Sequence, residues 1–278
     1  MPDGRPFRKK RTLTERRRRL FYLKTAVLIG FAIWLFIVLA WLSYQPVFTI
    51  KEIEFTGLAL VDKSIVNEVV EKNTRQKTLG LISRKTLLTL PRSAIKESLY
   101  SSSPSIKEVS FDFTGINKLA VFIKEREPVG VWCGLSPSPD PLQENCFFVD
   151  EDGFVFSRAP VTTGAVYVRY YGGLANPFPP IGLSLLDKKV FLELRFFLET
   201  LKSSGVSVLR VILDDGFEVS LDLAGGGKVI FSLKSDLHKT LDNLEVFVAR
   251  GGDGDTAKYL GSFQYVDLRF GNKIYFKR

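Results

Sequence analysis

The sequence predicts a mixed α+β protein with one N-terminal membrane helix and two folded domains beyond it. Three observations predict this class. A long uncharged apolar segment begins at Thr25, a strand-helix-helix-strand-strand pattern follows it, and short alternating strands with two amphipathic helices occupy the rest of the 278 residues. Hydrophobic residues make up 45% and charged residues 25% of the chain, which is typical of folded domains.

The net charge of +9 is concentrated at the N-terminus. Residues 1–24 contain ten Lys and Arg against Asp3 and Glu15, so they form a basic tail. Beyond this tail, 29 basic residues are balanced by 28 acidic ones, and no positive field is left to attract DNA or RNA to the folded part. We therefore expect no nucleic-acid partner.

Residues 25–44 (TAVLIGFAIWLFIVLAWLSY) are predicted to form a transmembrane helix. At about 1.5 Å per residue this segment matches the hydrocarbon core of a bilayer, about 30 Å thick. Phe21 and Tyr22 precede it and Trp41 and Tyr44 lie at its end, where aromatic residues anchor helices in the interface. Because the nearby Lys and Arg lie on the N-terminal side, we expect a single-pass protein of the cell membrane, with a cytoplasmic N-terminus and an extracytoplasmic C-terminus.

Two alternatives concern this N-terminal region. A cleaved signal peptide is disfavoured, because the apolar run is longer than usual and residues 41–44 (WLSY) do not resemble a cleavage site. The basic tail has two interpretations that the sequence leaves open. It is either a topology signal that also contacts anionic lipid, or a docking site for a cytoplasmic partner.

Residues 47–126 are predicted to form a small α+β domain. Alternation between Phe48 and Phe55 indicates a strand, and apolar residues at helical spacing indicate helices after Asp62 and after Pro91. A hairpin is expected from residues 109–113 and 119–123 with a turn at 115–117. This order predicts two helices on one face of a three-stranded sheet.

Residues 127–278 are predicted to form a second α+β domain with a mixed or antiparallel sheet. Strands are expected near Phe147, Val155, Val166, Val208, Phe217, Val229, Tyr265 and Ile274. Two amphipathic helices interrupt them. The first presents Leu186, Val190, Leu194, Phe197, Leu198 and Leu201, and the second presents Leu237, Leu241, Leu244, Phe247 and Val248. We expect both apolar stripes to pack on the sheet.

Few residues suit catalysis or metal binding. His238 is the single histidine, and it is expected at the surface or the cap of the second helix. The run 225–228 (GGGK) lacks the flanking residues of a phosphate-binding loop, and a structural zinc site requires four ligands. We expect no enzyme activity, no cofactor and no metal.

Cys133 and Cys146 flank a loop rich in Ser and Pro, between two strands that are expected to be adjacent. A disulfide between them is chemically permitted outside the cytoplasm and would contribute about 3 kcal/mol by closing a short loop. Two free thiols are the alternative.

The last predicted strand, 272–278 (NKIYFKR), ends the chain, so no later segment covers its outer edge. A free edge offers N–H and C=O groups to an extended segment of a partner. Apolar Ile274, Tyr275 and Phe276 lie among Lys273, Lys277 and Arg278 in this strand. Binding of another protein is therefore the expected role, with Phe270 and Tyr275 as the foremost contacts.

Several sequence fragments, taken in order, resemble one protein family. They are residues 48–57 (FTIKEIEFTG), 87–90, 104–109 (PSIKEV), 124–128 (KEREP), Trp132, 148–156 (FVDEDGFVF) and 265–270 (YVDLRF). Together they resemble the FtsQ/DivIB family of bacterial cell-division proteins. The resemblance implies a POTRA domain at 47–126 and a C-terminal β-rich domain at 127–278.

The resemblance further implies a scaffold at the division septum. Such a protein recruits small bitopic partners of the FtsL and FtsB type and, through them, the septal peptidoglycan synthases. The implied contacts are Arg269, Phe270, Lys273, Ile274, Tyr275 and Phe276. The chain departs from the family pattern after Phe270, between Cys133 and Cys146, and at 115–117. For residues 265–270, a strand pair that only completes the fold is the alternative.

A second hypothesis comes from another class. A membrane-tethered hydrolase or transpeptidase of the cell envelope could act through Cys133, which would require a free reactive thiol. A POTRA-bearing component of an outer-membrane transporter is disfavoured, because too little chain follows for a barrel.

Overall fold

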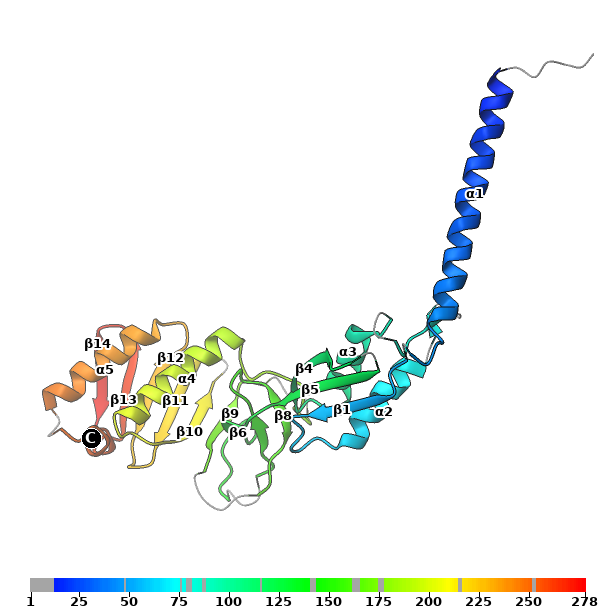
Figure 1. Cartoon of the computed structure of the whole chain (residues 1–278). Coiled ribbons are helices and arrows are strands. Elements are labelled where there is room, and N and C mark those ends of the chain that lie inside the picture. The colour runs from blue at the N-terminus through cyan, green and yellow to red at the C-terminus, as the bar shows by residue number, and fades with distance from the viewer. Residues whose placement is uncertain are drawn as a thin grey trace, which may run out of the picture. The chain divides into compact units, whose positions relative to one another are not determined.

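The computed structural model describes residues 13–47, 49–75, 77–78, 82–86, 89–115, 117–140, 144–161, 166–174, 178–214, 217–251 and 254–278. The helices (Figure 1) are α1 (Leu13–Leu42), α2 (Lys63–Arg75), α3 (Arg92–Ser102), α4 (Lys188–Ser203), α5 (Leu237–Gly251) and α6 (Thr256–Gly261). Parts of the expectations concern residues 1–12 of the basic tail, Phe48, Leu87 and Ile116, which lie outside the described residues.

Among the described residues, fourteen strands accompany these helices. They are β1 (Glu52–Thr56), β2 (Lys77–Thr78), β3 (Ile82–Ser83), β4 (Ile106–Phe113), β5 (Lys118–Glu125), β6 (Gly130–Trp132), β7 (Phe147–Val149), β8 (Val155–Arg158), β9 (Val168–Gly172), β10 (Val208–Leu213), β11 (Glu218–Leu223), β12 (Lys228–Ser232), β13 (Tyr265–Phe270) and β14 (Lys273–Lys277). The mixed α+β class that the sequence predicts is confirmed.

α1 is a continuous 30-residue helix that includes most of the predicted membrane segment. An 18-residue window of the stretch Arg17–Leu42 has a mean hydropathy of 2.5, and most of its apolar side chains are exposed. Within the described residues it is the one helix long and apolar enough to cross a membrane, and its length and composition equally suit a signal sequence. The helix begins at Leu13, inside the basic tail, and ends before Tyr44, which lies in a turn.

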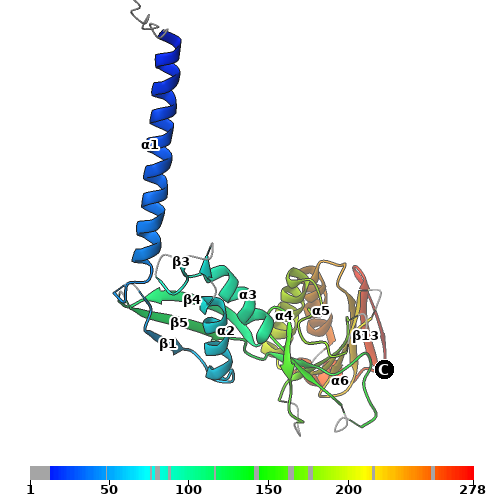
Figure 2. The same cartoon turned by 90° about the vertical axis from the view of Figure 1, so that its right-hand side faces the viewer.

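The chain forms two compact units. The first comprises Met1–Ser102 and Glu108–Ile123, and the second comprises Ser103–Lys107 and Lys124–Arg278. In the first unit, β5 lies between β1 and β4, and β1 runs parallel to β5. α2 and α3 lie beside this three-stranded sheet (Figure 2). They bury Val66, Val70, Ile95 and Leu99 completely.

Two details of the first unit differ from the expectation. The first strand was expected from Phe48, but its described part starts at Glu52. Before it, Ile50 donates its N–H to the carbonyl of Lys85 in a neighbouring segment (2.8 Å). A short hairpin of β2 and β3 also lies between the helices, where the sequence predicted only a break. Strands of two residues are too short to show an alternating pattern.

The second unit is built on a nine-stranded mixed sheet. Its strand order is β14-β13-β12-β11-β10-β9-β6-β7-β8. β9 is parallel to both β6 and β10, and β12 is parallel to β13, whereas the other neighbours for which a register is defined are antiparallel. The expected mixed sheet is therefore present.

The topology places the two long helices on one face of this sheet. α4 connects β9 to its parallel neighbour β10, and α5 with α6 connects β12 to β13 in the same sense. Because such crossovers are almost always right-handed, both helices lie on the same side (Figure 1). They form one core with the sheet, to which α4 contributes Phe191, Leu194 and Phe197 and α5 contributes Leu237, Leu241 and Leu244.

α6 was not predicted. Two helices were expected in this unit, but residues 256–261 form a third one. A helix of six residues is too short to show apolar residues at helical spacing. Asp255 caps it by accepting a hydrogen bond from the Lys258 N–H (3.0 Å).

A smaller cluster covers part of the opposite face. Residues alternate along a strand, so Tyr170 of β9 packs with the helices while Tyr171 points to the other side. Tyr171 packs there with Val131, Cys133 and Ala159.

Candidate protein-binding site

β14 forms one end of the nine-stranded sheet. It pairs with β13 and with no other strand of the described residues. The pairing is antiparallel, with Tyr265 opposite Lys277 and Asp267 opposite Tyr275. The outer edge of β14 is thus free to accept another strand.

A tight turn joins the two strands. Gly271 occupies a left-handed conformation (φ 64°) that glycine adopts without strain, and its carbonyl accepts a hydrogen bond from Asn243 Nδ2 on α5 (3.0 Å). The register shifts between Asp267 and Phe270. This irregularity places Phe270 opposite Lys273 at the end of the hairpin.

Arg269 is held by two carboxylates of its own chain. Its Nε and Nη2 donate to Asp267 (2.9 and 2.6 Å), and its Nη1 donates to Glu218 Oε2 on β11 (2.6 Å). Burial alone raises the pKa of Asp267, but the hydrogen bonds and charge of Arg269 more than offset it, so the pKa lies below its usual value. The hydrogen bond with Asp267 correspondingly raises the pKa of Arg269.

Phe270 and Tyr275 form an exposed aromatic pair. Their rings meet edge to face with centroids 5.1 Å apart, and 54% and 51% of these residues are exposed. The guanidinium of Arg269 lies 5.5 Å from the Phe270 ring centroid, which is cation–π range. The ion-paired arginine therefore lies directly beside the exposed aromatic pair.

Ile274 and Phe276 belong to the other face of the strand. Ile274 packs against the main core, and Phe276 contacts the rings of Phe247 and Phe263 at centroid distances of 5.4 and 5.3 Å. Phe276 is nevertheless 52% exposed. These two side chains thus connect β14 to its own unit.

Of the six residues predicted to bind a partner, the structure brings Arg269, Phe270 and Tyr275 together. Lys273 is exposed opposite Phe270. Sequence reasoning missed Asp267, Glu218 and Asn243, which hold the arginine and the turn. Glu218 is 51 residues from Arg269, and no local pattern connects them.

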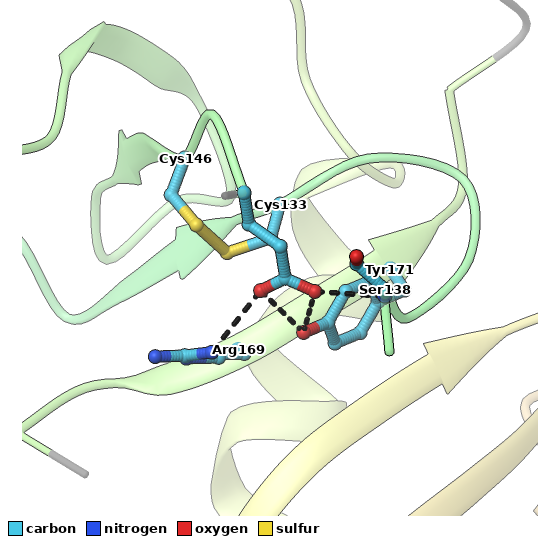
Figure 3. Close-up of a disulfide and its surroundings, with 6 residues drawn as sticks. Cys133, Ser138, Cys146, Arg169 and Tyr171 are labelled. Atoms are coloured by element: carbon cyan, nitrogen blue, oxygen red, sulfur yellow. Dashed lines mark hydrogen bonds and ion pairs between the residues drawn. A yellow bond between two sulfur atoms is a disulfide. The ribbon is translucent and has the colours of Figure 1, made fainter. Parts of the chain in front are cut away.

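Cys133 and Cys146 form a disulfide (Figure 3). The Glu144 carboxylate is buried beneath it and accepts hydrogen bonds from the Tyr171 hydroxyl (3.0 Å), the Ser138 N–H (2.9 Å) and Arg169 Nη1 (3.1 Å). Burial, and next the bond to Glu144, raise the pKa of the Tyr171 hydroxyl.

The disulfide bears on the metal and enzyme hypotheses. Among the described residues, Cys133, Cys146 and Glu144 come close enough to share an ion, but both sulfur atoms are bonded to each other. Cys133 therefore has no thiol to serve as a nucleophile or ligand. His238 lies on α5, on the other side of the sheet, with its ring 4.8 Å from that of Phe196.

The predicted anchoring aromatics flank the apolar part of α1. Phe21 and Tyr22 are exposed eight and nine residues after the helix begins at Leu13, and Trp41 and Tyr44 are exposed in its last turn and just after it. From Tyr22 to Trp41 the helix rises about 30 Å at 1.5 Å per residue, which matches a hydrocarbon core.

Fold and site together define an α+β protein with an N-terminal apolar helix of membrane-spanning length and a free sheet edge that exposes aromatic side chains. A scan against protein-family models and a search of curated proteins find no match to this chain.

Proposed function

We propose that this protein is a bitopic scaffold of the bacterial division machinery, of the FtsQ/DivIB type. In this proposal α1 is an uncleaved anchor, the N-terminus lies in the cytoplasm, and both folded units lie outside and gather at the septum. The protein recruits and regulates its partners by binding and catalyses no reaction.

The free edge of β14 is the observation that carries this proposal. A partner strand added there would gain main-chain hydrogen bonds, and the Phe270–Tyr275 pair would supply the buried aromatic contact typical of binding hot spots. Lys273 and Lys277 would favour an acidic partner segment. The proposed partners are small bitopic proteins of the FtsL and FtsB type and, through them, the septal peptidoglycan synthases.

The first unit supports the same proposal. Its order β1–α2–α3–β4–β5, with β5 in the middle of the sheet, agrees with a POTRA-like domain, and the β2–β3 hairpin is an addition to that pattern. We propose residues 47–126 as this domain and residues 127–278 as the β-rich domain.

Photocrosslinking in dividing cells tests the proposal. A photoreactive amino acid at position 270, 273 or 275 is expected to capture a small bitopic division protein. Val246 on α5 is also exposed and serves as the control position. Capture of the same chains from position 246, or of unrelated envelope proteins only, would refute the edge as the binding site.

The enzyme hypothesis has a separate test. Thiol labelling of the denatured protein without reductant is expected to modify neither Cys133 nor Cys146, because they form a disulfide. A labelled Cys133 would revive a hydrolase or transpeptidase.

A further inference from the structure

Two sequence segments of the first unit contain basic residues and no acidic residue. Residues 43–51 contain Lys51, and residues 76–91 contain Lys77, Arg84 and Lys85. In the other residues after the basic tail, 28 acidic residues outnumber 25 basic ones. These two segments are thus positively charged, whereas the rest of the chain after the basic tail is slightly acidic.

The fold brings these segments together at the end of the helix. Ser43, in the turn that follows α1, is buried, and its Oγ accepts a hydrogen bond from the Ser83 N–H (3.2 Å). Thr49 and Thr86 form an antiparallel bridge, and the Ile50 N–H donates to the Lys85 carbonyl (2.8 Å). Lys51, Arg84 and Lys85 therefore lie on two neighbouring backbone segments. We call these three residues the basic cluster.

Two residues of the basic cluster lack an acidic partner in the part of the chain that the structure describes. Lys51 and Lys85 are exposed, and neither forms an ion pair with a described residue. The nearest acidic residue in sequence, Glu52, is paired with Lys118 (2.5 Å). Like charges on neighbouring backbone segments repel each other, so an anion from outside would stabilise this arrangement.

Apolar surface continues from α1 to the basic cluster. Trp41, Tyr44 and Val47 are all exposed. Tryptophan and tyrosine prefer the level of the lipid headgroups. Lys51 follows the end of α1 by nine residues, and Arg84 and Lys85 lie on the segment that pairs with the backbone next to Lys51. With α1 across the membrane, the basic cluster therefore lies near the bilayer interface, where lysine side chains extend toward phosphate groups.

We propose that the basic cluster binds the phosphate groups of anionic phospholipids in the outer leaflet of the membrane that α1 crosses. This second contact would hold the base of the first unit at the bilayer surface. The inference rests on the membrane anchor proposed above, and it is independent of any partner at β14.

Hydrogen exchange of the full-length protein in lipid nanodiscs tests this. One nanodisc contains phosphatidylcholine only, and the other contains about 30% phosphatidylglycerol. A basic residue near an anionic surface gains roughly fivefold in affinity. We therefore expect amides 49–51 and 82–86 to exchange on the order of fivefold more slowly with the anionic lipid. About 0.5 M salt should abolish the difference by screening.

Two double variants make the test specific. Lys51→Glu/Lys85→Glu is expected to exchange at the same rate in both nanodiscs. Lys72→Glu/Lys239→Glu, which reverses two exposed lysines elsewhere, is expected to keep the wild-type difference. Equal exchange of the wild type in both lipids, or an unchanged difference in the first variant, would overturn the proposal. Failure of the wild type to enter nanodiscs would instead overturn the anchor and the cluster with it, while the β14 crosslinks would be unaffected.

Discussion

At the scale of single residues, Asp150 connects two sequence fragments that suggested the family resemblance. It is 1% exposed, and its Oδ1 accepts from the N–H groups of Asp152 and Phe154 (2.9 Å each). Its Oδ2 accepts from Arg126, whose guanidinium lies 4.0 Å from the Phe154 ring centroid. Arg126 also donates to the Pro104 carbonyl (3.0 Å). One buried ion pair therefore explains the arginine in residues 124–128 (KEREP) and the first aspartate in residues 149–153 (VDEDG).

Replacement of Arg126 by Met is expected to lower the free energy of unfolding by about 3–5 kcal/mol, because it leaves Asp150 buried without its cation. Urea denaturation checks this. Arg158→Met is the control, since exposed Arg158 bonds only the Asn145 side chain among the described residues and should cost at most about 0.5 kcal/mol. A similar loss in both variants would contradict the proposed role of the pair.

The ion pair of Asp267 with Arg269 is expected to stabilise the protein to an extent that depends on pH. Its pKa in the folded protein is lowered, so its contribution is complete above the unfolded pKa of about 3.9 and is lost as the pH falls through the folded value. We expect Asp267→Asn to reduce the dependence of unfolding free energy on pH below about pH 4. Denaturation of wild type and variant across this range measures the difference. Parallel pH profiles would show that the Asp267–Arg269 pair does not contribute.

At the scale of elements, the β13–β14 hairpin has two faces with different tasks. Ile274 and Phe276 face the helices and attach β14 to its own core. Phe270 and Tyr275 lie on the other face, exposed beside the ion-paired Arg269. An edge strand must remain attached while its outer side stays available, and the alternation of side chains along β14 permits both.

Because the two faces of β14 have different tasks, substitutions on them are expected to affect different properties: stability on one face and partner binding on the other. Phe276→Ala should destabilise the protein by about 1–2 kcal/mol, since it removes ring contacts of a half-exposed side chain. Tyr275→Ala should change stability by at most about 0.5 kcal/mol but weaken partner capture from position 273 at least tenfold. Thermal unfolding and crosslink yield measure the two effects. Equal capture in both variants would show that Tyr275 is not a contact.

At the scale of the whole molecule, the excess of positive charge lies at the N-terminal side of the apolar segment. The basic residues of the tail lie before and in the first turns of α1, and the part of the chain after α1 is nearly neutral. Arg17, Arg18 and Arg19 are exposed on a helix that turns about 100° per residue, so together they surround more than half of it. Such an arrangement favours contact with lipid headgroups on all sides over a single docked partner.

Replacing Arg16 to Arg19 with Glu is expected to invert the orientation of a large fraction of molecules, because the excess of Lys and Arg flanking the helix sets topology. A protease-sensitive tag at the C-terminus, digested from outside spheroplasts, measures this fraction. Wild type should be cleaved almost completely. Glutamates at the exposed Lys72 and Lys239 serve as the control and should leave cleavage unchanged.

The sequence by itself determined the elements that depend on local patterns. Hydropathy gave α1, and alternation gave most strands, because both signals arise from residues close in the chain. The same reasoning found the apolar stripes of α4 and α5 and expected β14 as an edge strand, and β14 does lie at the end of the nine-stranded sheet.

Only the tertiary structure decided which distant residues meet. Three contacts join residues that are far apart in the sequence: Glu218 with Arg269, Arg126 with Asp150, and Ser43 with Ser83. They depend on how strands and loops are arranged in space, which no local sequence period encodes. The structure also separated the six predicted contacts, directing Phe276 toward the core and Tyr275 outward. A strand's alternation defines two faces, but the packing of helices on the sheet decides which face is buried.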